Sequence, residues 1–443
     1  MALAAVAALA LAGCGGGGDD KDKTPSGGAS GTGAGQTVQL PKLDGQKLQV
    51  VAVWTGPEQE AFTKVLKEFE KRTGATVTYT PTQDAMLNYL GTKIAGGAPP
   101  DVALLQQPGA LAQAVSRKWL KPVSADAKAQ LTKNYPKGWQ DLGAVGGQQY
   151  GVYFKAANKS LVWYNAAAFE AAGAKEPKTW KEFMATAETI SASGVTPVSV
   201  GGADGWTLTD WFENVYLSQA GPQKYDQLAK HQIKWTDPSV KDALGTLGEL
   251  FGKPNLIAGG ADGALQTEFP ASVTQTFTGD QPKAAMVFEG DFASINIQQT
   301  KAKIGTDAKV FPFPAVGADA PVVTGGDVAV ALTDKPATQA LLTFLASPDA
   351  AGIWAGQGGF VSPNKSLDLK TYPNDVQREI AKALVDAGDT FRFDMSDQMP
   401  QSFGGTPGKG EWKLLQDFLK NPKDVAGTQA KLEAEAAKAF GQS

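Results

Sequence analysis

The strongest constraint on the fold is an alternation of short apolar runs and longer amphipathic stretches that starts at Lys47. The spacing of the apolar residues predicts strands in the short runs and helices in the longer stretches. The expected strands are residues 47–53, 76–80, 101–105, 152–154, 161–164, 197–200, 284–288 and 328–332. The expected helices are residues 57–72, 84–95, 181–192, 207–218 and 337–346, and the carboxy-terminal part is mostly helical. Strand–helix–strand units form a parallel sheet covered by helices on both faces, so we expect two α/β lobes.

Composition narrows the functions that are open to the chain. It has 443 residues, a formal net charge of −4, one histidine (His231) and one cysteine (Cys14). Without a basic surplus, nucleic acid is not an expected partner. A histidine–cysteine zinc site would need three or four such ligands. The classes of function that remain are catalysis by carboxylates and ligand binding without catalysis. His231 is expected in a surface or loop position.

The first residues resemble the leader of a bacterial lipoprotein. Residues 2–12 are an unbroken apolar run, too short to span a bilayer but typical of the hydrophobic region of a secretion signal. The run ends in Leu11-Ala-Gly-Cys14, which looks like a lipobox, the motif whose cysteine receives lipid. We therefore expect residues 1–14 to be a signal peptide and Cys14 to anchor the chain to a membrane, on its extracellular or periplasmic side. The alternative is a short buried helix followed by an incidental cysteine. No lysine or arginine precedes the run, which leaves the position of the start codon open.

Residues 15–45 are expected to form a disordered tether. The stretch up to residue 35 is rich in glycine and polar residues and cannot bury enough apolar surface to fold. A glycine-rich chain of this length has a root-mean-square reach of roughly 30 Å. The folded part is therefore expected to lie just off the membrane.

Large aromatic and polar side chains flank the expected strands, at positions where α/β sheets bind their ligands. These residues are Trp54, Gln107, Lys155, Trp206, Asp210, Trp211, Glu289 and Asp327. An indole ring can pack against the C–H face of a sugar, while carboxylates, amides and lysine hydrogen-bond its hydroxyl groups. The mixture therefore favours a carbohydrate ligand.

A structural role is the alternative for six of these positions. For Trp54, Trp206 and Trp211 it is a place in the core or between the lobes. For Glu289 it is a turn or a helix cap, and for Lys155 and Asp210 it is a solvated surface. Asp291 is expected to cap the following helix. The tryptophans expected to serve in packing are Trp119, Trp139, Trp180, Trp235 and Trp412.

Several segments of the chain resemble the family 1 extracellular solute-binding proteins of carbohydrate ABC importers, in particular the α-glucoside-type members. The matching segments are residues 54–62, 97–105, 159–165, 207–211, 325–329, 358–365 and 389–394. The most specific are Gly97-Ala-Pro-Pro-Asp101 and Gly358-Gly-Phe-Val-Ser-Pro-Asn-Lys365. The resemblance covers nearly the whole expected folded part.

This resemblance implies a type II periplasmic-binding-protein-like fold, with two discontinuous lobes, a hinge and a cleft between the lobes. The first lobe would comprise residues 46–155 and 320–363, and the second residues 156–319 and 364–443. The residues expected on the rim of the first lobe are Trp54, Gln59 and Gln107, and those facing them are Trp206, Asp210, Trp211 and Glu289. The residues expected near the hinge or cleft are Asp327, Phe360 and Arg392. A structural pair of Arg392 with Asp394 or Asp389 is the alternative.

The function implied by the resemblance is that of a monomeric, lipid-anchored receptor without a cofactor. It would bind a sugar, such as an α-glucoside or an oligosaccharide, and deliver it to permease subunits in the membrane. Two alternatives stay open. One is a secreted glycoside hydrolase with Asp210 and Glu289 as its carboxylate pair. The other is the same receptor fold with a peptide, a polyamine or a metal chelate as its ligand.

Overall fold

The folded unit begins at Val38, before the point that the sequence suggests. The computed structural model describes residues 37–82, 86–279, 281–387 and 390–441, so Cys14, the expected leader and residues 15–36 lie outside the described part. Val38 and Leu43 are buried in the hydrophobic core, and the amide of Val38 donates a hydrogen bond to Asp349 Oδ2 at 3.0 Å. The expected tether therefore ends before residue 45, because two apolar side chains already pack onto the core.

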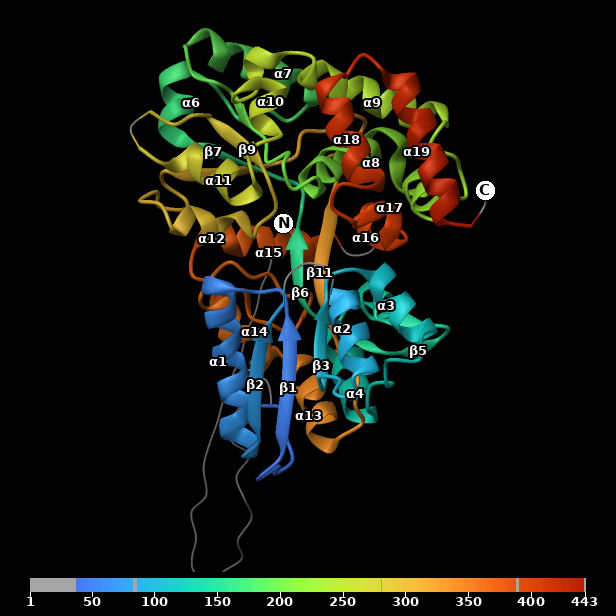
Figure 1. The fold of residues 1–443 in the computed structure, drawn as a ribbon. Helices are drawn as coiled ribbons and strands as arrows, with labels where there is room; N and C mark the ends of the chain where they lie inside the picture. The colour runs from blue at the N-terminus through green and yellow to red at the C-terminus, as the bar shows by residue number, and fades with distance from the viewer. Residues whose placement is uncertain (1–36, 83–85, 280, 388–389, 442–443) are drawn as a thin grey trace, which may run out of the picture. The chain divides into compact units, whose positions relative to one another are not determined.

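A mixed sheet of six strands forms the centre of the first lobe (Figure 1). Its strands are β1 (Lys47–Ala52), β2 (Thr76–Pro81), β3 (Val102–Leu105), β6 (Gly151–Asn158), β11 (Val323–Ala331) and β12 (Arg392–Phe393). Strands β2, β1 and β3 are parallel, and β11 runs antiparallel to β3 and β6. The carboxyl ends of β1 and β3 lie at one edge of the sheet, which brings the residues after them together.

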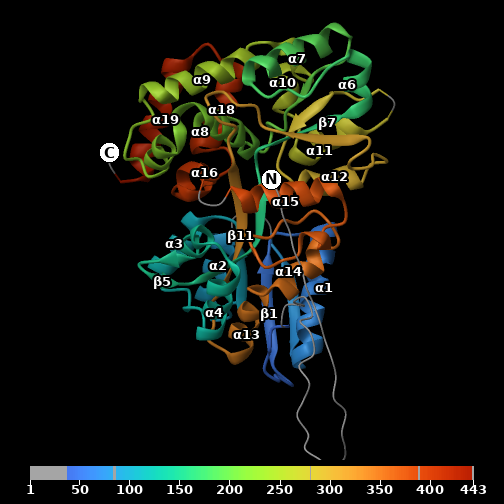
Figure 2. The ribbon, with the colours of Figure 1, turned by 180° about the vertical axis from the view of Figure 1, so that it is seen from behind.

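Helices pack around this sheet (Figures 1 and 2). They are α1 (Gly56–Thr73), α2 (Met86–Ala95), α3 (Pro108–Ser116), α4 (Ala125–Asn134), α5 (Lys137–Leu142), α13 (Pro336–Leu345), α14 (Pro348–Ala355) and α15 (Asp375–Asp386). The first lobe also contains a short hairpin, β4 (Ala144–Val145) and β5 (Gln148–Gln149), and a 3₁₀ turn at Leu369–Thr371. Helix α1 follows its sequence closely: Pro57 opens it, Gly74 ends it in the left-handed conformation, and Phe62 and Phe69 lie on its buried face.

The second lobe contains a four-stranded sheet in the order β10-β7-β9-β8. Its strands are β7 (Leu161–Asn165), β8 (Val198–Ser199), β9 (Met286–Phe288) and β10 (Ala308–Pro312). Its helices are α6 (Ala166–Ala172), α7 (Trp180–Ala192), α8 (Trp206–Ala229), α9 (Pro238–Phe251), α10 (Gly260–Ala264), α11 (Phe269–Phe277), α12 (Ala293–Gln298), α16 (Met395–Gln398), α17 (Gln401–Gly404), α18 (Gly410–Lys420) and α19 (Val425–Ala439), with a 3₁₀ turn at Pro254–Leu256. Helix α8 extends beyond the expected end at residue 218, with a kink where Gly221 has a φ of 81° and Pro222 follows.

Strands β6 and β11 connect the two lobes, as both views show (Figures 1 and 2). The assignment of residues 364–393 to the second lobe is corrected by the structure. Strand β12 pairs with β11 in the first sheet, and Ile380 and Leu384 of α15 are buried in the core that contains β1 and β3. The chain enters the second lobe again only at α16, because the apolar face of α15 packs on the first lobe. The expected two-lobed α/β architecture is confirmed.

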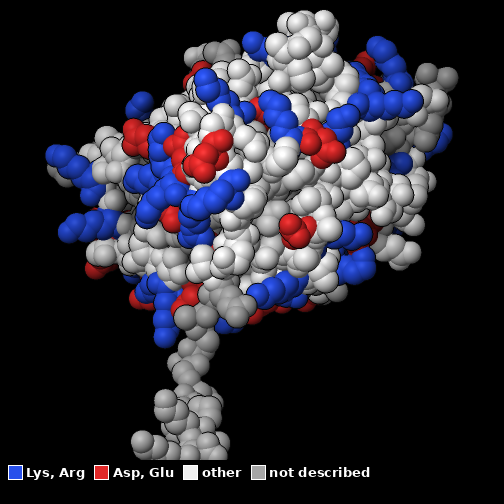
Figure 3. All heavy atoms as spheres, turned by 90° about the horizontal axis from the view of Figure 1, so that it is seen from below, with Lys and Arg blue, Asp and Glu red and all other residues white. Residues whose placement is uncertain are grey.

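The charges on the outer surface are mixed. On the face seen from below, at the end of the first lobe, lysine and arginine side chains are interspersed with aspartate and glutamate (Figure 3). Among the described helices, none combines the length and the apolar character that crossing a bilayer requires.

Candidate functional site

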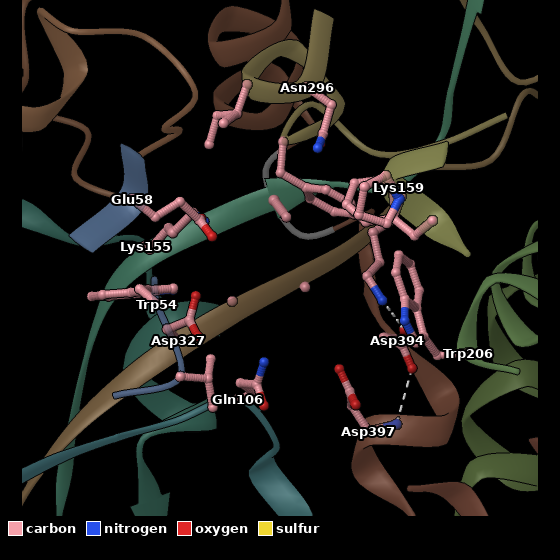
Figure 4. A pocket seen from close by; sticks show the side chains of 18 of the residues that line it. Trp54, Glu58, Gln106, Lys155, Lys159, Trp206, Asn296, Asp327, Asp394 and Asp397 are labelled. Carbon is pink, nitrogen blue, oxygen red and sulfur yellow. Dashed lines mark hydrogen bonds and ion pairs between the residues drawn. The ribbon is translucent and has the colours of Figure 1, made fainter. Parts of the chain in front are cut away.

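A cavity of about 620 Å³ is lined by residues of both lobes (Figure 4). On the first lobe it is bounded by the segments that follow β1 and β3 and by residues of β6 and β11. On the second lobe it is bounded by α12, by α16 and by the first residues of α8, α11 and α18. Small-molecule sites typically have volumes of about 300–1,000 Å³, so the cavity has the size of such a site.

Two lysines reach the cavity from the segment that crosses between the lobes. Lys155, Ala157 and Lys159 all line it, and alternate residues of an extended chain face the same side. Lys155 lies within β6, and Lys159 follows the end of that strand. The spacing therefore places one ammonium group near each lobe.

Lys155 is surrounded by carboxylates and an indole ring on the first-lobe side (Figure 4). Its Nζ lies 2.5 Å from Glu58 Oε1 and 5.6 Å from the ring centroid of Trp54. Asp327 pairs with Lys155 in the β6–β11 ladder, beside a β-bulge that redirects the side chains. A Cβ atom on Gly326 would lie 2.7 Å from the carbonyl oxygen of Lys155, so glycine is required for this close approach of the strands.

Burial and charge set the protonation of this group of residues. Burial opposes the charge on Lys155, but the carboxylates of Glu58 and Asp327 raise the pKa of its ammonium above the ordinary value. Burial raises the pKa of Asp327 to about 7, although the charge of Lys155 opposes this shift. The first-lobe side of the cavity therefore holds a cation next to a carboxyl group that titrates near neutral pH.

Lys159 makes corresponding contacts with the second lobe. Its Nζ lies 2.5 Å from Asp394 Oδ2 and 3.1 Å from Asp210 Oδ1, and 5.4 Å from the ring centroid of Trp206. Burial opposes its charge, but Asp210 and Asp394 raise the pKa of the ammonium well above the ordinary value. Burial raises the pKa of Asp210 well above its ordinary value. Burial opposes ionisation of Asp394 as well, but Lys159 brings the pKa of that carboxyl below its ordinary value.

A hydrogen bond between the lobes lies at one side of the cavity. Asp394 caps α16 by accepting a hydrogen bond from the amide of Asp397 at 2.9 Å. The side chain of Asp397 accepts a hydrogen bond at its Oδ1 from Gln107 Nε2 of the first lobe, at 3.0 Å. Burial and the neighbouring Asp394 carboxylate raise the pKa of Asp397 to about 7. Gln107, at the start of α3, therefore contacts the second lobe directly.

An aromatic wall forms the second-lobe face of the cavity. The ring centroid of Trp206 lies 5.3 Å from that of Phe269 and 5.9 Å from that of Phe292, and all three residues line the cavity. Trp206 is half-buried. Trp54 is only 3% exposed and packs edge-on against Phe62. Trp206 therefore presents more ring surface to a ligand than Trp54 does.

The structure brings together five of the residues chosen from the sequence. Those that line the cavity are Trp54, Gln107, Lys155, Trp206 and Asp327. Asp210 lies behind them, in contact with Lys159. The chosen residues that do not line this cavity are Gln59, Trp211, Glu289, Phe360 and Arg392.

The structure places Trp211 and Phe360 in the hydrophobic cores, which corrects their expected role. Trp211 is 1% exposed, and its ring centroid lies 4.6 Å from that of Phe288. Phe360 stacks on Trp354 with their ring centroids 5.1 Å apart. Both positions lack ring surface facing the cavity, so the structural alternative holds for Trp211.

Three polar residues among those chosen also have structural surroundings. The carbonyl oxygen of Gln59, in the first turn of α1, accepts a hydrogen bond from Thr63. Glu289 is buried, and burial together with the Asp210 carboxylate raises its pKa well above the ordinary value. Arg392 Nε forms an ion pair with Asp226 Oδ1 at 2.8 Å. The structure therefore shows an ion pair of Arg392 with Asp226, where the sequence led us to expect Asp394. The other expected partner, Asp389, lies outside the described residues.

One further expectation is wrong, and two hold only in part. His231 lies in a turn after α8, as a loop position predicts, but it is buried and not on the surface, with its Nε2 3.2 Å from Glu433 Oε2. Asp291 does not cap α12; its Oδ1 accepts a hydrogen bond from the amide of Asn158 at 2.6 Å. Trp412 lines the cavity in addition to packing against α8.

Several polar residues of the cavity are not predicted from the sequence. These are Glu58, Lys159, Asn296, Asp394 and Asp397. The alternation of residues along the strand would have found Lys159, which follows Lys155 by four positions. Glu58 lies in the first turn of α1, just after β1. Asn296, Asp394 and Asp397 reach the cavity from the second lobe, and no local pattern reports how the two lobes face one another.

The cavity does not contain the carboxylate pair of the proposed hydrolase. Neither Asp210 nor Glu289 lines it, and a glycosidase needs both carboxyl groups next to the scissile bond. Within the described residues, no group of three or more His, Cys, Asp or Glu side chains is placed to hold a metal ion. The lining of aromatic, amide and charged groups fits reversible binding of a small polar molecule.

Comparisons with known proteins identify the family. Residues 55–352 match the family described as bacterial extracellular solute-binding protein. The osmoprotective compounds-binding protein of Synechocystis sp. is 34% identical over 385 residues, which cover 85% of this chain and 89% of that protein. The alpha-glucosides-binding periplasmic protein of Rhizobium meliloti is 33% identical over 401 residues, which cover 87% of this chain and 86% of that protein.

A solved structure shows the same fold at lower sequence identity. A bacterial solute receptor described for its preference for β-D-galactopyranose superimposes with a TM-score of 0.76 at 20% identity, covering 89% of this chain and 99% of the receptor. The expected fold class is thereby confirmed. The chain belongs to the bacterial extracellular solute-binding proteins, a family of binding proteins rather than enzymes, as the sequence predicts.

Proposed function

We propose that this protein is the lipid-anchored substrate-binding component of an ABC importer and that its ligand is a sugar, with α-glucosides as the first class to test. The observation that carries the proposal is the composition of the cavity between the lobes. A half-buried indole, Trp206, faces a space in which charged and amide side chains of both lobes converge. The ligand-binding roles of these residues are part of the proposal.

The chemistry of a sugar matches this arrangement. One face of a pyranose ring exposes C–H groups, which pack on an aromatic ring and leave water. Its hydroxyl groups act as donors and acceptors, and the carboxylates of Glu58 and Asp327 and the ammonium of Lys155 offer charge-assisted hydrogen bonds to them. A hydroxyl group in the wrong orientation would leave one of these buried groups unpaired, at a cost of about 1–3 kcal/mol. The cavity can thus distinguish one sugar from another.

The relatives support a sugar as the ligand and suggest which sugars to try. The Rhizobium meliloti relative is named for α-glucosides and the Synechocystis relative for osmoprotective compounds. Because the identities of 34% and 33% leave room for a change of ligand, the first screen should cover several sugars.

Isothermal titration of the purified protein tests the proposal. We expect heat of binding with at least one of maltose, trehalose, isomaltose and longer glucans. Trp206→Ala should weaken that binding, whereas Trp119→Ala should leave it unchanged, because Trp119 lies outside the cavity and packs under Arg117. If no carbohydrate gives heat, the sugar proposal is wrong.

The lipid anchor is tested separately, because Cys14 lies outside the described residues. The full chain expressed in bacteria should incorporate labelled palmitate and partition with membranes. Cys14→Ser should abolish the label and release the protein. Ser26→Ala, within the same glycine-rich stretch, is the matched control. Membrane association of the Cys14→Ser protein would contradict the proposed anchor.

A further inference from the structure

The cavity between the lobes holds more carboxyl groups than ammonium groups. A further carboxyl group, that of Asp210, lies behind the lining in contact with Lys159. Among the described residues, five carboxyl groups thus share two ammonium groups. Where these carboxyl groups are ionised, a ligand enters an excess of negative charge. The ionisable residues that line the cavity are Glu58, Lys155, Lys159, Asp327, Asp394 and Asp397.

Both ammonium groups are already engaged with carboxylates. Lys155 Nζ lies 2.5 Å from Glu58 Oε1. Lys159 Nζ lies 2.5 Å from Asp394 Oδ2 and 3.1 Å from Asp210 Oδ1. These contacts offset the charge of each lysine. Among the described ion pairs, they leave the two remaining carboxyl groups of the lining without a cation of their own.

The two remaining carboxyl groups are those of Asp327 and Asp397. Asp327 is only 9% exposed, and its carboxyl group has neither a hydrogen bond nor an ion pair to any residue that the structure describes. Asp397 accepts a hydrogen bond from the neutral amide of Gln107. In the view of Figure 4 the side chain of Gln106 lies between the two, and all three line the cavity. The side of the cavity at Gln106 therefore has two carboxyl groups that a ligand can pair.

Closure of the lobes over a ligand removes water from these carboxyl groups, and a buried carboxylate without a counter-charge is costly. Burial raises the pKa of both Asp327 and Asp397 to about 7, and the charge of Asp327 also raises that of Asp397. A sugar hydroxyl can donate a hydrogen bond to such a carboxylate, but it brings no opposite charge. An ammonium group supplies the hydrogen bond and the charge together.

We propose that the ligand is a sugar with a positively charged amino group, and that this group binds between Asp327 and Asp397. The inference rests on the proposed function, since it takes the ligand to be a sugar. The sugar ring packs on Trp206, and the amide oxygen of Gln106 offers the ammonium group a further acceptor. Repulsion from the two lysines is weak, because each already contacts a carboxylate.

The test compares three forms of the same sugar by isothermal titration of the full protein. They are the parent sugar, a derivative with one amino group in place of a hydroxyl group, and the N-acetyl form of that derivative, whose nitrogen is uncharged. Trehalose and maltose are the parents, and each hydroxyl group is replaced in turn. We expect at least one amino derivative to bind at least about tenfold more tightly than both its neutral forms. If neutral sugars bind and no amino derivative exceeds them, the inference is refuted while the proposed function stands. If no form of any sugar binds, both fall.

Variants locate the amino group. Asp327→Asn and Asp397→Asn keep the shape of the side chain and remove its charge. Each should lower the ratio of the affinity for the amino derivative to that for its parent by at least about threefold, because one of the two charge-assisted hydrogen bonds is lost. The ratio separates this effect from any change in how the parent sugar binds. Asp262→Asn, at an exposed position of α10 that does not line the cavity, is the matched control and should keep the ratio. A ratio that is unchanged in both Asp327→Asn and Asp397→Asn overturns the proposal.

Discussion

Trp206 and Trp211 are five positions apart in α8, yet their surroundings are opposite. A helix turns by about 100° per residue, so five positions rotate the side chain by about 500°, which leaves the two indoles about 140° apart. Trp206, the first residue of the helix, therefore faces the cavity, while Trp211 faces the core. Both residues follow the expected strand at residues 197–200, and helical geometry separates their roles.

Substitution should separate these roles in solution. We expect Trp206→Ala to weaken sugar binding by about 1–3 kcal/mol, through loss of ring packing against the ligand. Trp211→Ala should instead lower the free energy of unfolding by about 3–5 kcal/mol, because it leaves a cavity in the core. Titration calorimetry and urea unfolding on both variants measure the two effects. Unchanged affinity in Trp206→Ala would assign that indole to packing.

Lys159 is the single ammonium that contacts both Asp210 and Asp394 among the described ion pairs. We expect Lys159→Met to lower the free energy of unfolding by about 3–5 kcal/mol, because two buried carboxyl groups lose their cation. Urea unfolding near pH 7 measures this. Lys253→Met is the matched control, since Lys253 and its partner Glu188 are 44% and 58% exposed and should contribute less than about 1 kcal/mol. Equal losses in the two variants would contradict the assignment.

At the residue scale, the sequence correctly predicts that aromatic and charged residues line the cavity, but it identifies only some of them. Lys155 and Asp327 were found because they lie next to strands that can be read from the apolar pattern. Asp394 and Asp397 were missed because α16 is a single short turn without periodicity. The matching motif at residues 389–394 points to Arg392 instead, and only the fold shows that Arg392 forms an ion pair with Asp226.

At the scale of elements, the contact between α3 and α16 holds the two lobes close at the cavity wall. Gly109 makes this contact possible, because a Cβ atom there would lie only 2.6 Å from the carbonyl oxygen of Met399 and 3.2 Å from that of Asp397. Overpacking of this kind typically costs about 1–3 kcal/mol. The strain falls on an interface between lobes that a bound ligand must bridge.

We therefore expect Gly109→Ala to weaken ligand binding by about 1–3 kcal/mol by keeping the lobes apart at this wall. Gly245→Ala is the matched control: Gly245 lies in α9, with no atom within 4 Å of an added Cβ. That change should leave binding intact and stabilise the protein by about 0.4–1 kcal/mol. Titration calorimetry measures the affinities, and thermal unfolding measures the stabilities. If Gly109→Ala binds the ligand as tightly as the unmodified protein, closure at α3 does not matter for binding.

The order of elements is largely predictable from the sequence, and the lobe assignment is not. Residues 57–72 and 181–192 were expected as helices and are observed as Gly56–Thr73 and Trp180–Ala192. Their apolar periodicity and end residues are local properties. The packing of α15 on the first lobe depends on which surface its apolar face meets, and the sequence of α15 describes only that face.

At the scale of the whole molecule, several buried carboxyl groups link stability to pH. Burial raises the pKa of Asp291, Asp327 and Asp397 to about 7, and it raises the pKa of Glu213 and Glu411 well above the ordinary value. In the unfolded chain such groups ionise near pH 4. Between about pH 4 and 7 the unfolded state therefore binds fewer protons than the folded state, so these groups contribute stability at low pH that is lost as the pH rises.

Glu411 isolates this effect in one side chain. It is fully buried in the first turn of α18, and neither of its carboxyl oxygens has a hydrogen-bond partner among the described residues. Burial raises its pKa, and the Asp394 and Asp210 carboxylates act in the same direction. Glu411→Gln removes the ionisation of this side chain in the folded and in the unfolded state. The free energy of unfolding of the variant minus that of the unmodified protein should therefore increase as the pH rises from 5 to 8. The gain is at most about 1.4 kcal/mol per pH unit.

Urea unfolding of Glu411→Gln and of the unmodified protein across that pH range measures the gain. A constant offset between the two curves reports only how well the amide fits its site, because such an offset does not depend on protons. The slope of this difference against pH measures the change in proton binding on unfolding, and it should be positive. A flat or falling difference for Glu411→Gln would mean that Glu411 is ionised inside the fold, and the cluster of buried carboxyl groups around Lys159 would then need a second cation.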